Sequence, residues 1–282
     1  MITIKITVDG QEITVGKNAP YKLLSHSGLD NAAFEVSVQA SGATDGGYIQ
    51  SARISSRTVT VSFDIVGNQA DALRLALTRL FTPHKQVTLT VTRANVTRKI
   101  SGVFSMVTVT QGNIYENPTV QLTIMCPNPY FVSIDNFGRN LAEKTAMFYL
   151  PAASPVGTTF PISVKAFEER VHLVNDGDVP AGLVAQFIMR GSVTNPLIRN
   201  YTTGNAVKVI DSFAQGDVLE VSTITGAKTV TKNGTNIINK TDRSSVFSDF
   251  LQVGDNEISY EAESGEGSMD VYIYYSPLYL GV

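Results

Sequence analysis

The chain has 282 residues, of which 43% are hydrophobic and 17% are charged, with a net charge of −3 at neutral pH. This length and apolar content can bury a sizeable core and indicate two domains. Because no basic run is present, the composition argues against a sequence-specific nucleic-acid binder. The charged fraction is below the usual value of about 25%, which indicates a surface covered by other protein or simply a threonine-rich β protein.

The single cysteine, Cys126, leaves no internal disulfide to form. The first residues, MITIKITV, alternate in polarity, so we expect no signal peptide. No apolar run is long enough to span a membrane, and we expect no membrane insertion. The chain should therefore be made and folded in a cytoplasm.

The first half begins with β-strand patterns. Alternation over Ile2–Val8, the turn Asp9-Gly10 and the segment Glu12–Val15 predict a hairpin. Residues 18–30 are expected to be irregular. Residues 33–40 and 49–54 read as strands, separated by a mobile Gly- and Ser-rich loop over 41–47.

A β–α–β pattern occupies residues 57–108. Strict alternation begins at Arg57, and helical spacing then takes over in a stripe of apolar residues: Leu73, Ala76, Leu77, Leu80 and Phe81. Asn68 is the predicted N-cap and Pro83 the predicted stop. Strands resume on either side of a turn at Ala94-Asn95, and a last strand over 120–124 leads into CPNPYF.

Two helix residues point away from the apolar stripe. Leu75 lies on the polar face, together with Arg79. An isolated exposed leucine is common on protein surfaces. The alternative is that Leu75 and Arg79 belong to an interface between subunits.

The second half shows strand patterns without a convincing helix. The predicted strands are Phe160–Ala166, His172–Val174, Leu183–Arg190, Ala206–Ile210, Val218–Ser222, Glu257–Glu261 and Met269–Tyr275. Turn signals such as Asn195-Pro196 and Asn233-Gly234 separate them, which favours a β-sandwich. We predict domains at 1–135 and 136–282, with a junction within 133–160.

No pattern of catalytic residues is present. His26, His84 and His172 lack metal-ligand spacing, and Cys126 has no evident histidine partner. The Asp176–Asp178 segment reads as a tight turn more readily than as a cation site. We expect no metal, no cofactor and no enzymatic activity.

The polar faces of the first-domain strands are rich in threonine instead of Lys and Glu. They carry Thr58, Thr60, Thr88, Thr90, Thr92 and Thr108. Threonine favours strands in general, but an uncharged polar face also suits a surface that lines a lumen or is covered by neighbours.

Taken in order, several short motifs resemble the distal tail proteins of siphoviruses, the phages with long non-contractile tails. In the first half these are Gly28-Leu29, Asp45-Gly46-Gly47, Arg57, Gly67, Leu80-Phe81 and CPNPYF. In the second half they are Asn175–Asp178 with Pro180, Asn195-Pro196, Gly216-Asp217, Asn233-Gly234, Leu251 with Gly254–Asn256, and SPLYLGV.

The resemblance implies a structural protein that is mainly β with one α-helix. Its N-terminal domain would be a β-sandwich-like tail-tube domain forming a hexameric ring, and its C-terminal domain a galectin-like β-sandwich. The ring would be the baseplate hub that joins the tail tube protein to the tail-tip protein and, in some phages, to receptor-binding proteins. The location would be the tail tip of the virion, after assembly in the bacterial host cytoplasm. The alternative is a carbohydrate-binding module or adhesin, although the chain has no Trp.

Overall fold

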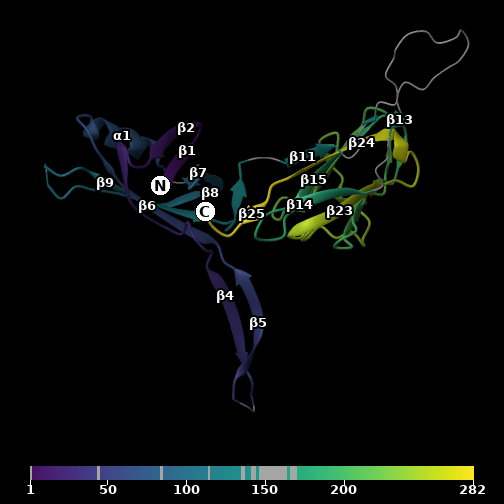
Figure 1. Ribbon diagram of the computed structural model, residues 1–282, viewed down its shortest axis with the longest axis horizontal. Helices are drawn as coiled ribbons and strands as arrows, with labels where there is room; N and C mark the ends of the chain where they lie inside the picture. The colour runs from purple at the N-terminus through teal and green to yellow at the C-terminus, as the bar shows by residue number, and fades with distance from the viewer. Residues whose placement is uncertain are drawn as a thin grey trace, which may run out of the picture. The chain divides into compact units, whose positions relative to one another are not determined.

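The computed structural model describes residues 2–42, 45–82, 85–113, 115–134 and 170–282, and the backbone alone of 137–140, 144–145 and 164–165. The chain divides into two compact units (Figure 1). Unit 1 comprises Met1–Ile134 with Leu278–Val282, and unit 2 comprises Asp135–Pro277. The last five residues therefore pack with unit 1, whereas the sequence analysis assigned them to the second domain. The predicted junction lies largely outside the described residues.

Unit 1 is built on one nine-stranded antiparallel sheet. Its main path runs in the order β2-β1-β7-β8-β9-β6-β3, and the short strand β10 pairs with both β8 and β25. The strands are β1 (Ile2–Val8), β2 (Gln11–Val15), β3 (Tyr21–Ser27), β6 (Arg57–Ile65), β7 (Gln86–Arg93), β8 (Val96–Thr110), β9 (Thr119–Cys126), β10 (Phe131–Ser133) and β25 (Leu278–Tyr279). Strand β3 corrects the prediction of an irregular segment over 18–30, because pairing with β6 supplies backbone partners that composition does not reveal.

The core of unit 1 follows the alternation of its strands. In β6, Val59, Val61, Phe63 and Ile65 are fully buried, and the intervening residues face outwards. The helix α1 (Ala70–Leu80) adds Leu77, and Phe81 follows as its C-cap. Its N-cap is Gln69 without a side-chain hydrogen bond, so the prediction of Asn68 was wrong by one residue. Pro83 lies outside the described residues.

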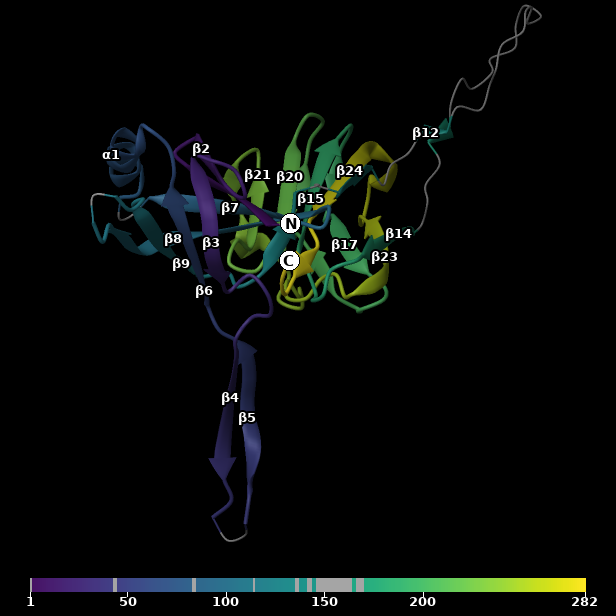
Figure 2. The same cartoon turned by 60° about the vertical axis from the view of Figure 1, so that its left-hand side comes forward.

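Two strands of unit 1 stand apart from the main sheet. Strands β4 (Phe34–Ala40) and β5 (Gly47–Ile54) pair only with each other and form a long antiparallel hairpin. Figures 1 and 2 show this β4–β5 hairpin projecting away from the unit 1 sheet. The sequence analysis predicted both strands, but their alternation gave no sign that the remainder of the unit leaves them uncovered.

Unit 2 is a β-sandwich. The six-stranded sheet contains β11 (Phe137–Asn140), β24 (Met269–Tyr275), β15 (Leu183–Met189), β20 (Val218–Ser222), β21 (Thr229–Lys232) and β22 (Thr235–Asn236), in that order. The four-stranded sheet contains β14 (Val171–Asn175), β23 (Gly254–Glu261), β17 (Leu197–Asn200) and β18 (Ala206–Lys208). Buried residues of both sheets, such as Phe187 and Ile258, form one core.

Smaller elements complete the unit. They are the strand pairs β12 (Lys144–Thr145) with β13 (Val164–Lys165) and β16 (Val193–Thr194) with β19 (Ser212–Phe213), and the 3-10 helices η1 (Ile238–Lys240) and η2 (Glu266–Ser268). Strands β20 and β24 have the residue bounds that the sequence predicted, whereas strands β17 and β21 were not predicted. The expectation of a mainly β protein with one α-helix among the described residues is confirmed.

Arg57 joins its own strand, β6, to three distant segments of unit 1. Its side chain is 3% exposed and donates hydrogen bonds to the carbonyls of Pro129 (2.7 Å), Gly28 (2.9 Å), Asp30 (2.8 Å) and Leu280. The charge is thus satisfied by backbone dipoles, as a buried guanidinium requires. Burial lowers the pKa of Arg57.

Two further arginines, Arg93 and Arg98, hold the C-terminal segment, and Arg93 donates to the carbonyl of Val282 at 3.3 Å. Arg98 donates to the carbonyl of Gly281, and its guanidinium lies 3.5 Å from the centroid of the Tyr279 ring. The backbone N–H of Val282 donates to the carbonyl of Leu29 at 3.0 Å. Glycine is required at 281, because a Cβ there would lie 2.7 Å from the carbonyl oxygen of Asp30. Residues 278–282 are therefore an integral part of unit 1.

Candidate subunit interface

The described residues contain no group of three His, Cys, Asp or Glu side chains that could hold a metal ion. His84 lies outside the described residues, and His26 and His172 lie on different strands in different units. In the suspected Asp176–Asp178 turn, the Asn175 side chain accepts a hydrogen bond from the Gly177 N–H and donates to the carbonyl of Val179. These bonds account for the shape of the turn.

Cys126 has the properties of a core residue. It is fully buried, and burial raises the pKa of its thiol to about 11. Because the thiolate is the nucleophile, a thiol reagent should react with Cys126 only after unfolding. We expect no reaction with a colorimetric disulfide reagent in the native protein and one equivalent in denaturant. Rapid stoichiometric labelling of the native protein would contradict this assignment.

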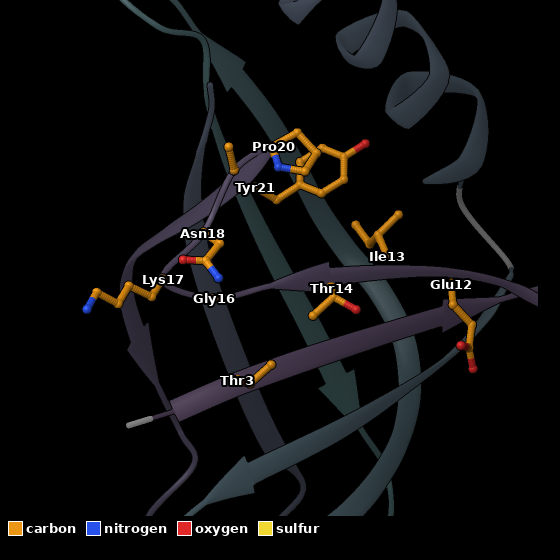
Figure 3. A pocket seen from close by; sticks show the side chains of 10 residues that line it. Thr3, Glu12, Ile13, Thr14, Gly16, Lys17, Asn18, Pro20 and Tyr21 are labelled. Atoms are coloured by element: carbon orange, nitrogen blue, oxygen red, sulfur yellow. The ribbon is translucent and has the colours of Figure 1, made fainter. Parts of the chain in front are cut away.

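A shallow pocket lies beside the edge strand of unit 1. It is lined by residues of β1, β2 and the turn that leads into β3, including Thr3, Glu12, Lys17 and Tyr21. Figure 3 shows Glu12 and Lys17 at opposite ends of this pocket, and Glu12 is paired with Lys5 at 2.9 Å. The two charges therefore do not converge on one point within the pocket.

The two predicted interface residues lie on the outer face of α1. Leu75 is 53% exposed, and Arg79, one turn later on the same face, is also exposed. Leu77, on the opposite face, is 2% exposed. For these three residues the orientation deduced from helical spacing is correct, but Ala76, which was expected in the apolar stripe, is exposed. The role of Leu75 and Arg79 in an interface stays a prediction.

The threonines of the main sheet lie on its outer face together with a few charged residues, and Lys5 and Lys99 are direct cross-strand neighbours of Thr90. Pairs of hydroxyl groups bond across neighbouring strands, as between Thr88 and Ser101 (3.0 Å) and between Thr92 and Thr97 (3.0 Å). Among the charged residues of this face, Asp64 accepts a hydrogen bond from Thr119 at 2.6 Å. The sheet thus presents a threonine-rich outer face on which several polar side chains bond to one another.

The β4–β5 hairpin is amphipathic. Cross-strand pairing places Phe34 opposite Ile54, Val36 opposite Ala52 and Val38 opposite Ile49. Direct cross-strand partners share a face, so these six side chains form one apolar face. A bulge in β5, between Ile49 and Ser51, makes this possible, because without the extra residue Ile49 would lie with the polar side chains.

The other face of the hairpin is polar and internally paired. Arg53 contacts Glu35 at 2.8 Å, and the Tyr48 hydroxyl donates to Gln39 at 2.7 Å. The apolar face, in contrast, is open: Phe34 is 65% exposed, Val38 62% and Ile49 67%. The alternation of β4 indicated this face, but the bulge that adds Ile49 to it and its exposure to solvent could be seen only in the structure.

Unit 2 also carries exposed aromatic residues. The Tyr201 ring has the Arg170 guanidinium 4.1 Å and the Arg199 guanidinium 5.7 Å from its centroid. Its hydroxyl donates to Glu261 at 2.9 Å. Because these contacts already engage the ring, Tyr201 is poorly suited to stack on a sugar.

Comparisons with known proteins agree with this architecture. Residues 176–279 match the family model described as "Siphovirus-type tail component, C-terminal domain". The resemblance to the siphovirus tail family is thereby confirmed. A comparison with curated proteins finds no match.

Solved structures extend the likeness to nearly the whole chain. The fold is similar to that of the Dit protein of phage SPP1, which is described as a paradigm of the hub adsorption apparatus in phages infecting Gram-positive bacteria. The two sequences are 16% identical, the TM-score is 0.65, and the match covers 98% of this chain and 99% of that one. It is also similar to a chain of the phage P2 baseplate in its activated conformation with Ca, with 12% identity, a TM-score of 0.54 and 98% coverage of both chains. These matches show a shared fold over nearly the whole chain.

None of the helices described in this chain is both long and apolar enough to cross a membrane.

Proposed function

We propose that this protein is a structural hub component of a siphovirus tail tip, in which unit 1 forms a hexameric ring and unit 2 faces outwards from it. The observation that carries the proposal is the combination of a family match over 176–279 with a hub-protein fold over 98% of the chain. The tail tube protein and the tail-tip protein are the expected partners. The virion tail tip is the expected location, after assembly in the host cytoplasm.

Several features of unit 1 support a ring. The hairpin carries an open apolar face, and the outer face of α1 carries an exposed leucine. The outer face of the main sheet is rich in threonine and carries few charged residues, which suits burial against protein or exposure to a lumen. Large exposed apolar surfaces on soluble proteins commonly mark interaction sites.

The ring can be tested on the purified full chain. Native mass spectrometry and negative-stain microscopy over a range of concentrations should show closed rings of six copies. Antibodies against unit 2 should label one end of the tails of the corresponding virions. A protein that stays monomeric at all concentrations, or tails without label, would contradict the proposal.

Substitution of Leu75 tests the helix surface. Leu75→Glu should leave the melting temperature of the monomer nearly unchanged, because the side chain is already exposed. It should weaken ring assembly, measured by light scattering at high protein concentration, because a charge would be buried at the contact.

Leu77→Ala is the matched control on the same helix. It should lower the free energy of unfolding by about 2–5 kcal/mol through the cavity it creates, and any loss of assembly should follow that loss of fold. If Leu75→Glu assembles like the wild type, Leu75 is an isolated surface residue and the ring contact lies on another face of unit 1.

A further inference from the structure

The β4–β5 hairpin lacks a packing partner within the described chain. An isolated two-stranded hairpin is marginally stable in water, and here only the polar face is held together by side-chain pairs such as Glu35 with Arg53. On the opposite face, Phe34, Val38 and Ile49 are each more than 60% exposed. The apolar side is therefore the one that needs a covering surface.

A second apolar surface lies on the outer face of the main sheet. Val103 and Met125 are direct cross-strand partners on β8 and β9, and Met106 pairs with Thr123 two residues before Met125. Their exposed fractions are 38% for Val103, 44% for Met125 and 48% for Met106. We call these three residues the methionine patch.

The surroundings of the methionine patch are uncharged. The neighbouring strand positions on its cross-strand pairs are Gln86, Thr58, Thr60 and Thr123. The apolar face of the hairpin likewise carries no charge, because Glu35 and Arg53 lie on its other side. The two surfaces match in polarity, and neither would have to bury an ion when they meet.

The geometry favours contact between copies. Figures 1 and 2 both show the hairpin directed away from the sheet of its own unit, so it does not cover the methionine patch of its own chain. The eight residues of β5 extend over about 25 Å at roughly 3.3 Å per residue, enough to cross about five neighbouring strands. A contact between two different patches is heterologous, the type that closes cyclic rings.

We propose that the apolar face of the β4–β5 hairpin of one copy packs on the methionine patch of the next copy. This inference rests on the ring assigned under the proposed function and identifies its donor and acceptor surfaces. The hairpin is the donor arm, and the outer face of β8 and β9 is the acceptor.

The heterologous character allows a mixing experiment with two full-length variants. Val38→Glu removes the donor surface and keeps the acceptor, and Met125→Glu removes the acceptor and keeps the donor. Each variant alone should stay monomeric, with the dissociation constant for self-association raised by at least about tenfold. An equimolar mixture should form 1:1 heterodimers that do not grow, because only one productive contact remains per pair.

Two control substitutions are made in the same full-length chain, and the same measurement is applied to all variants. Ser51→Glu on the polar face of the hairpin and Thr97→Glu elsewhere on β8 should assemble like the wild type. All variants should keep the wild-type melting temperature, since every substituted side chain is at least partly exposed. Sedimentation equilibrium at high protein concentration measures the species present.

The outcomes separate this docking from the ring itself. Monomeric single variants that form heterodimers on mixing support the docking. If either Val38→Glu or Met125→Glu still forms rings, the ring stands and this docking is wrong. If Val38→Glu binds neither itself nor Met125→Glu while Met125→Glu forms wild-type rings, the hairpins pack on another surface. A wild-type protein that never assembles overturns the ring and the docking together.

Discussion

Replacement of Arg57 by methionine is expected to lower the free energy of unfolding of unit 1 by about 3–5 kcal/mol. The guanidinium donates to four backbone carbonyls in a region that is closed to water. Methionine fills a similar volume but removes all the hydrogen bonds that the guanidinium donates to those carbonyls, and losing a charged donor to buried groups is costly. Denaturant unfolding followed by fluorescence or circular dichroism measures the loss.

Two variants sharpen this test. Arg57→Lys keeps the charge but has three donors on a flexible side chain instead of a planar guanidinium. Its free energy of unfolding should therefore lie between those of Arg57→Met and the wild type. Arg53→Met, on the hairpin, removes an arginine whose side chain is 72% exposed, and should change stability by less than about 0.5 kcal/mol. A loss below about 1 kcal/mol for Arg57→Met would show that water reaches the carbonyls.

Deletion of residues 278–282 is expected to destabilise unit 1 although these residues follow unit 2 in the sequence. The deletion removes β25, the ring of Tyr279 under Arg98, and the carbonyl groups that Arg57 and Arg98 bind. The loss should reach about 4 kcal/mol or more, from hydrogen bonds to charged groups worth about 1.5–3 kcal/mol each and from exposure of apolar area. This is a large part of the stability of an ordinary domain.

Calorimetry on the full chain can assign the loss to one unit. Leu77→Ala, in the core of unit 1, and Leu183→Ala, in the core of unit 2, mark the two unfolding transitions. The deletion should move the transition that responds to Leu77→Ala. Tyr279→Ala is a milder variant that should shift the same transition if the deleted protein cannot be purified. A shift confined to the transition marked by Leu183→Ala would contradict the packing of 278–282 in unit 1.

The two changes should not be additive. Arg57 and residues 278–282 share the contact to the Leu280 carbonyl, so the double variant should lose less stability than the sum of the two single changes. Full additivity would mean that this shared contact contributes little.

Local patterns predicted most elements but not their partners. The period of two marked β6, β20 and β24, and the change to helical spacing located α1 and the outward position of Leu75. Strand β3 was not predicted, because its residues alternate poorly and it becomes a strand through its pairing with β6. The hairpin strands were predicted, yet an alternating pattern is the same whether the apolar face is buried in the chain or left for another copy.

The C-terminal segment shows where the sequence stops being informative. The motifs Gly28, Arg57, CPNPYF and SPLYLGV lie far apart in the sequence, and local patterns predict only the structure around each of them. Only the tertiary structure brings them together, because the contacts of Arg57 join residues separated by 27 to 223 positions. Local propensity acts over a few residues, whereas a buried charge is stabilised by whichever distant carbonyls the fold places around it. The sequence alone thus determined the strands, the helix and the family resemblance, and the fold decided that the last five residues complete unit 1.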